Sequence, residues 1–120
     1  MLYNRRKSRV QTAKDAFGVF IREKLGELPK REVAEFYAKT KPGIRDAVQR
    51  VGHYLTREKR TRLERAWKDY DEIPAQVLDR RHEGAMGEAI RDLHKVAGAE
   101  FQSPYEIVKF YLDLFYEFSA

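Results

Sequence analysis

Apolar residues recur at helical spacing through most of the chain. In six segments they stand three, four and seven positions apart, a pattern that predicts amphipathic helices with one buried face. The predicted helices cover residues 8–25, 29–39, 44–54, 57–70, 85–97 and 103–120. The sequence contains no run of alternating apolar and polar residues bounded by hairpin turns. We therefore expect an all-α fold, a single-domain bundle of five or six helices spanning residues 1–120.

Prolines, glycines and capping residues set the expected boundaries of these helices. Pro42 and Gly43 stand together and predict a break between the second and third helices. Thr56 is placed to cap the fourth helix. Residues 71–87 show little periodicity, although Ile73, Val77 and Leu78 would pin them to the core as a short helical turn. Residues 1–7 are expected to form a mobile basic arm.

The C-terminal segment has the clearest helix start in the chain. Ser103 followed by Pro104 and Glu106 forms a capping box ahead of a strongly apolar run. Its polar positions fall on one narrow stripe, and aromatic and aliphatic residues cover the rest of the helix. Such a helix must be central in the bundle or covered by a partner. The candidate interface residues form two flanks: Phe110, Leu114 and Phe118, or Tyr105, Leu112 and Tyr116.

Charge is distributed unevenly along the chain. Residues 1–70 hold 19 Lys and Arg against 9 Asp and Glu, a net charge of +10, whereas residues 71–120 hold 5 against 10, a net charge of −5. The basic half would attract an anionic partner. No segment has the apolar length of a signal peptide or a membrane span, and the sequence contains no cysteine. We expect a soluble, cytoplasmic protein.

The basic segment around the fourth helix has two interpretations. With the preceding helix, over Ile44 to Tyr70, it resembles a helix-turn-helix whose second helix would enter a major groove, assisted by the basic arm. The nucleic-acid candidates are Arg5, Arg6, Lys7, Arg9, Arg57, Lys59, Arg60, Arg62 and Arg65. Alternatively, these cations form i, i+4 pairs with acidic neighbours, as in Arg60–Glu64–Lys68, Glu58–Arg62 and Arg65–Asp69. Such pairs are typical of a solvated helix face, with Trp67 facing the core.

Other chemistry leaves little signal in the sequence. His53, His82 and His94 are far apart and form no ligand pair at helical spacing, so we expect no metal and no cofactor. His82 and Glu83 could act as acid and base, but the sequence offers no convergent third group. The glycines stand singly, without a phosphate-binding loop. An enzyme is therefore the least favoured class.

One segment resembles other proteins. Between Val33 and Tyr70 an apolar-rich helix is followed by Leu55, by the basic residues Lys59, Arg60 and Arg62, and by Ala66, Trp67 and Tyr70. In this order of features, and in ending on an apolar helix, the chain resembles a group of small helical bacterial proteins of unknown function. The resemblance covers about a third of the chain, implies a cytoplasmic helical protein and transfers no catalytic residue.

Taken together, these patterns favour a non-enzymatic helical binding protein that acts through protein–protein contact or self-association. The partner would be another protein or a second copy of the chain, contacted through the aromatic C-terminal surface. A nucleic-acid-binding module that uses the basic N-terminal half is the alternative.

Overall fold

Helices account for nearly all of the chain that the structure describes. The computed structural model describes residues 2–79 and 103–120, and in these ranges it contains α1 (Leu2–Glu27), α2 (Val33–Gly52), α3 (Arg57–Asp71), α4 (Ala75–Leu78) and α6 (Pro104–Glu117). No strand occurs among these residues. The all-α bundle expected from the sequence is confirmed. The helix expected over residues 85–97 lies outside the described residues.

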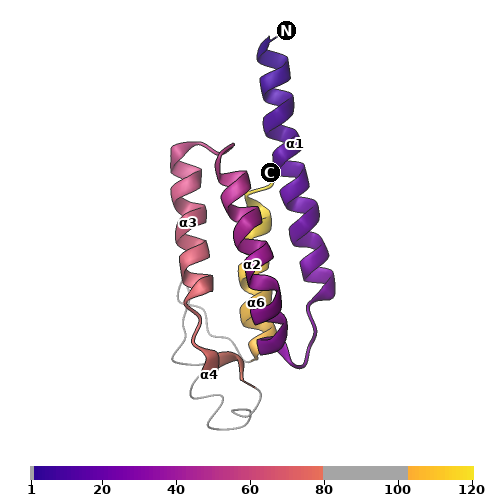
Figure 1. Cartoon of the computed structure of the whole chain (residues 1–120), viewed down its shortest axis with the longest axis vertical. Helices are drawn as coiled ribbons and strands as arrows, with labels where there is room; N and C mark the ends of the chain where they lie inside the picture. Colours follow the sequence, from indigo (N-terminus) through magenta and orange to yellow (C-terminus); the bar gives the residue numbers. More distant parts are fainter. Residues whose placement is uncertain (1, 80–102) are drawn as a thin grey trace.

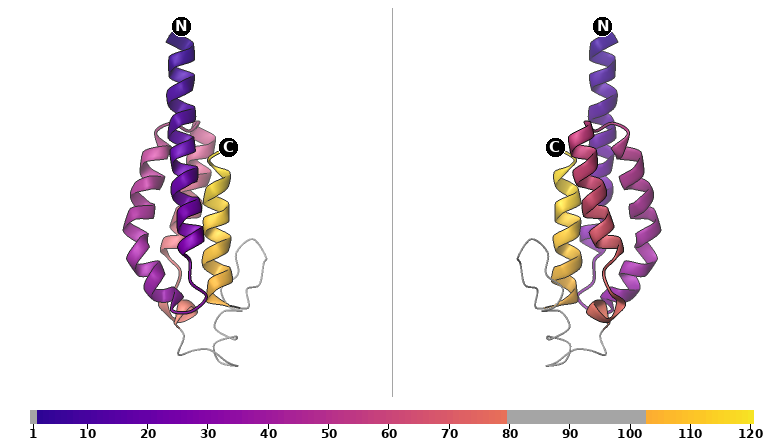
Figure 2. Two further views of the ribbon diagram at one scale, coloured as in Figure 1. Left: turned by 90° about the vertical axis from the view of Figure 1, so that its right-hand side faces the viewer. Right: turned by 90° about the vertical axis from the view of Figure 1, so that its left-hand side faces the viewer.

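Four long helices lie side by side, and the short α4 closes one end (Figure 1). α2 and α3 run in opposite directions as a hairpin, and α6 contacts α1, α2 and α3. α1 is longer than its neighbours, so its N-terminal end projects beyond the bundle in all three views (Figures 1 and 2). This projecting end has none of the other described helices beside it.

The start of α1 differs from the sequence prediction. The helix begins at Leu2 rather than near Ser8, so the segment expected to form a basic arm is helical. Its residues contain no proline or glycine before Gly18, and arginine and lysine are good helix formers. The mobility expected for residues 1–7 stays a prediction.

α2 corrects the prediction of two separate helices. It runs without interruption from Val33 to Gly52 and contains Pro42. An interior proline removes a hydrogen bond and costs about 3 kcal/mol in a helix. Buried side chains on both sides of the proline keep one helical stripe, which offsets this cost; they are Val33, Tyr37, Ile44, Val48 and Val51. α2 is visibly curved in Figure 2, as expected for a helix that contains proline.

Two helix caps form as the sequence predicts. The hydroxyl of Thr56 accepts a hydrogen bond from the backbone N–H of Lys59, at 3.3 Å, at the start of α3. The hydroxyl of Ser103 accepts one from the N–H of Glu106, also at 3.3 Å, at the start of α6. Each cap satisfies a backbone donor that the first helical turn leaves free.

The core is built around α6 and an aromatic cluster. Five α6 side chains are buried, and the polar stripe expected on this helix is exposed, with an ion pair of 2.9 Å between Lys109 and Asp113. The Tyr70 ring, fully buried, has its centroid 4.9 Å from that of Tyr37, 5.5 Å from that of Tyr111 and 5.4 Å from that of Phe115. These rings join α2, α3 and α6, since each helix contributes at least one of them.

The segment after α3 is held by the apolar residues that the sequence singled out. Ile73 is buried just after α3, and Val77 and Leu78 are buried on α4. Their expected role as a short helical anchor is confirmed.

Two tyrosine hydroxyls in this core should respond differently to removal. Tyr37 donates a hydrogen bond to the backbone carbonyl of Tyr70, whereas the buried Tyr70 hydroxyl has no hydrogen-bond partner among the described residues. We expect Tyr37→Phe to lower the free energy of unfolding by about 1 kcal/mol. Tyr70→Phe should leave it unchanged or raise it, since the substitution removes a polar group that burial penalises. Urea unfolding of both variants measures the difference, and equal losses would contradict this account.

Candidate protein-binding groove

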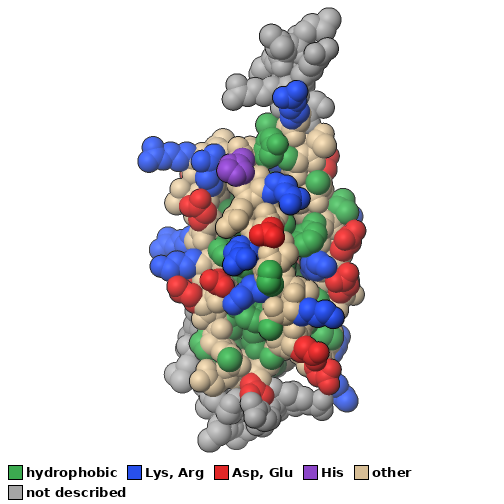
Figure 3. Space-filling model, viewed as in Figure 1, with side chains coloured by type: hydrophobic (Ala, Val, Ile, Leu, Met, Phe, Trp, Pro, Cys, Tyr) green, Lys and Arg blue, Asp and Glu red, His purple; other side chains and the backbone are tan. Residues whose placement is uncertain are grey.

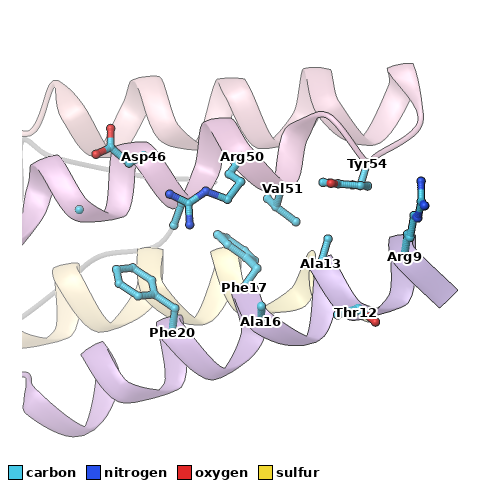
Figure 4. Close-up of a pocket in the computed structure, with 12 residues that line it drawn as sticks. Arg9, Thr12, Ala13, Ala16, Phe17, Phe20, Asp46, Arg50, Val51 and Tyr54 are labelled. Carbon is cyan, nitrogen blue, oxygen red and sulfur yellow. The ribbon is translucent and has the colours of Figure 1, made fainter. Parts of the chain in front are cut away.

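An open groove of about 750 Å³ lies between α1 and α2 (Figure 4). It runs from Phe20 and Asp46 at one end to Arg9 and Tyr54 at the other. The lining residues are Arg9, Thr12, Ala13, Ala16, Phe17 and Phe20 of α1, with Gly43, Asp46, Ala47, Arg50 and Val51 of α2, and Tyr54 just after α2.

The groove is apolar because the two helices turn small or aromatic residues toward it. Phe17 is buried and anchors α1, and Phe20 is partly buried beside it. The added Cβ of an alanine at Gly43 would lie 3.7 Å from Cζ of Phe20, so the two helices are close there. Tyr54 closes the other end and keeps 42% of its surface exposed, whereas every other aromatic side chain within residues 9–79 and 103–120 is at least partly buried.

Charged side chains stand at the rim. Arg50 extends from α2 toward α1 and lies over the groove near Phe17, and Arg9 lies at the end near Tyr54 (Figure 4). Asp46 lies at the opposite end. In the part of the chain that the structure describes, none of these three forms an ion pair. Hydrophobic side chains with basic and acidic neighbours are visible on this face in Figure 3.

The α6 candidates are mostly covered by the bundle, which is the first of the two arrangements expected for this helix. Leu112 is fully buried, which removes it from the candidate surface. Tyr105, Phe110, Leu114, Tyr116 and Phe118 are partly buried and pack against the core. α1 also engages Tyr116, since Arg22 donates a hydrogen bond to its hydroxyl and lies 5.2 Å from its ring centroid. Most of α6 therefore belongs to the interior, where its apolar surface is covered by other helices.

A second hollow separates the C-terminal end of the chain from α1. Its volume is about 670 Å³, and its lining includes Val19, Arg22 and Glu117. Val19 is 57% exposed and points away from the buried residues of α1. The outward face of α1 is thus apolar at this position.

The nucleic-acid candidates divide into three places. Arg5, Arg6 and Lys7 belong to the projecting end of α1, and Arg9 lines the groove. On α3, Arg57, Lys59, Arg62 and Arg65 are exposed. Arg60 is exposed as well, but it donates hydrogen bonds to the carbonyls of Gly52 and Leu55, at 2.8 and 3.3 Å, and so caps the end of α2.

The geometry of this region differs from a helix-turn-helix. In that motif the two helices cross at a large angle, whereas α2 and α3 form an antiparallel hairpin (Figure 1). Of the expected charge pairs on α3, Glu58–Arg62 forms, at 2.6 Å. No ion pair joins Arg60 to Glu64 or Arg65 to Asp69 in the described residues.

Histidine and carboxylate chemistry is sparse in the described ranges. His53 lines a hollow of about 490 Å³ between α2 and α3, together with Arg60, Glu64 and Trp67. His82, Glu83 and His94 lie outside the described residues. Within residues 2–79 and 103–120, no three His, Asp or Glu side chains come together to hold a metal ion. None of the helices in these ranges combines the length and apolar character that a membrane span requires.

The groove was not predicted from the sequence. The α2 wall lies almost wholly in the helix expected over residues 44–54, but the sequence does not indicate that this segment lies beside residues 9–20 of α1. A usable signal exists in α1, where Thr12 and Ala16, four positions apart, are small and lie away from the buried Phe17 and Ile21. Their spacing places a second, narrower apolar stripe on the outside of the helix.

No family model, no curated protein and no solved structure matches this chain.

Two helical glycines, the buried Gly18 and the exposed Gly43, should differ in their tolerance of a side chain. Both lie inside helices, where replacing glycine by alanine stabilises by about 0.5–1 kcal/mol if the new methyl group fits. At Gly43 the methyl group would make only an ordinary contact with Phe20, so Gly43→Ala should raise the free energy of unfolding. At Gly18 it would lie 2.9 Å from Cβ and Oγ of Ser119, so the gain should be cancelled or reversed. Thermal or urea unfolding compares the pair, and a loss at Gly43 matching that at Gly18 would contradict the groove geometry.

Proposed function

We propose that the protein is a non-enzymatic binding module that accepts an α-helix from another polypeptide chain in the groove between α1 and α2. The single observation that carries this proposal is the open apolar groove beside a helix that projects beyond its own bundle. Since the sequence contains no cysteine, the module suits a reducing compartment, and we assign it to the cytoplasm.

The groove favours a helix over an extended peptide. An added strand needs unpaired backbone groups at a sheet edge, and the described residues form helices whose backbone groups are already paired. The distance between the axes of two packed helices is shorter when the residues at their contact are smaller. Ala13, Ala16, Gly43 and Ala47 are small, so an incoming helix can approach both walls closely.

The rim indicates the chemistry of the incoming helix. Its apolar stripe would cover Phe20 and Tyr54, which bind as aromatic anchors do at interfaces. Arg9 and Arg50 outnumber Asp46 at the rim, so acidic residues beside the apolar stripe would be favoured. The proposed ligand is an amphipathic helix with acidic flanking residues.

Selection from a displayed library of helical peptides tests this function. We expect acidic amphipathic peptides to be enriched on the wild-type protein. Tyr54→Asp and Gly43→Glu should each weaken their binding by about tenfold or more, because each places a charge against the apolar stripe of the peptide. Fluorescence anisotropy with the enriched peptides measures the loss.

Gln49→Glu is the matched control. Gln49 is exposed on α2 but lines the hollow toward α3, so it changes the charge of the same helix outside the groove. Its binding should equal that of the wild type. Failure to enrich any helical peptide, or equal binding by the groove variants and the control, would contradict the proposal.

A nucleic-acid-binding module is a second candidate, favoured by the cations of α3. Arg57, Lys59 and Arg65 are exposed and have no ion-pair partner among the described residues. An antiparallel hairpin does not present α3 as a recognition helix, so contacts would be to phosphates and insensitive to sequence.

Salt-dependent binding to a DNA duplex tests this candidate. Replacing Arg57, Lys59 and Arg65 by glutamine should weaken binding for every duplex sequence and lower the salt dependence by about one charge per lost contact. Lys109→Gln on α6 is the control, because Lys109 is already paired with Asp113. Absence of binding at low salt would rule out this candidate.

A further inference from the structure

The outward face of α1 carries a second stripe that the bundle does not use. Arg9, Thr12, Ala16, Val19 and Glu23 follow one another at intervals of three and four residues, and all are exposed. This spacing is the one that places residues on a single helix face and that two-stranded helical pairs use at their contact. Arg9, Thr12 and Ala16 also line the groove, so the stripe is continuous with its α1 wall.

The two ends of the stripe carry opposite charge. Arg9 and Glu23 each stand seven positions from Ala16, on either side. At 1.5 Å per residue they are about 21 Å apart along the helix, too far to pair with each other. Neither forms an ion pair with any other residue that the structure describes.

We propose that α1 of a second copy of this chain packs antiparallel along this stripe, with a two-fold axis near Ala16. Reversing one helix places its Glu23 beside Arg9 of the other copy, and the two-fold axis forms the same pair twice. Thr12, Ala16 and Val19 are small enough for close contact at the centre. The inference goes beyond the proposed function, because α1 is a basic helix, with 7 Lys and Arg against 3 Asp and Glu, whereas the ligand proposed for the groove carries acidic flanking residues.

The projecting end of α1 supports this arrangement. A short helix without packing partners is marginal in water, yet α1 continues to Leu2 beyond the rest of the bundle. In the antiparallel pair, this end lies along the C-terminal half of the other α1. The same antiparallel register places Arg5 of one copy beside Glu27 of the other, because each stands eleven positions from Ala16 in the sequence.

Charge exchange tests the pairing in solution. Sedimentation over a concentration series should show a reversible dimer for the wild-type chain. Arg9→Glu and Glu23→Arg should each raise the dissociation constant by about tenfold, because two attractive contacts become repulsive. The double variant R9E/E23R should recover most of the affinity. Arg65→Glu on α3, an exposed arginine far from the stripe in sequence, should have no effect.

Single cysteines determine the direction of the pair, since the native chain contains none. Under mild oxidation, Arg9→Cys and Glu23→Cys should each fail to cross-link with themselves, and an equimolar mixture of the two should give a disulfide-linked dimer. The mixed dimer keeps one Arg9–Glu23 pair intact. Self-cross-linking of Arg9→Cys, with no disulfide between Arg9→Cys and Glu23→Cys in the mixture, would show a parallel pair and overturn the proposal.

A chain that stays monomeric at all concentrations, or a dimer that charge reversal leaves unchanged, would also overturn it. These outcomes can be distinguished from a failure of the groove to bind helical peptides. Selected helical peptides that bind the groove of a strictly monomeric chain would leave the proposed function standing. A dimer sensitive to Arg9 and Glu23 but not to Tyr54→Asp would place self-pairing on the stripe alone, outside the groove.

Discussion

Burial of the Tyr70 ring is the contact on which the rest of the bundle depends. Rings from α2, α3 and α6 surround it, namely Tyr37, Trp67, Tyr111 and Phe115. Aromatic pairs of this kind contribute beyond their buried area, and the Tyr37 hydroxyl adds a hydrogen bond to the Tyr70 backbone. Burial also raises the pKa of the Tyr70 hydroxyl strongly, because the phenolate would lose its hydration. The cluster thus fixes three helices with neutral side chains.

α1 contributes no ring to this aromatic cluster, and part of its surface stays uncovered. It packs on α2 and α6 through Phe17 and Ile21, which are buried, while its N-terminal end projects beyond the bundle. The side of α1 next to α2 opens into the groove, and the exposed Val19 lines the second hollow, between α1 and the C-terminal end of the chain. α1, which lies outside the aromatic cluster, is therefore the helix that leaves apolar surface exposed for contact with another helix.

Two corrections show how tertiary contacts overrule local preference. A proline followed by a glycine favours a helix end, but the buried residues before and after Pro42 keep a single stripe in register and α2 continues. Arg60 stands one turn from Glu64, yet its guanidinium bonds instead to the carbonyls at the end of α2. Those carbonyls become available only when α3 folds back against α2, so no spacing rule along one helix includes them.

What the sequence determined by itself is the all-α class, the caps of α3 and α6 and the buried face of α6. Caps at Thr56 and Ser103 and the apolar stripe of α6 depend on neighbours within a few residues, so local patterns predict them. The groove was decided by tertiary structure alone. Its walls bring residues 9–20 beside residues 43–54, and which of their apolar side chains stay uncovered depends on how α1 and α2 diverge, a property of packing between helices.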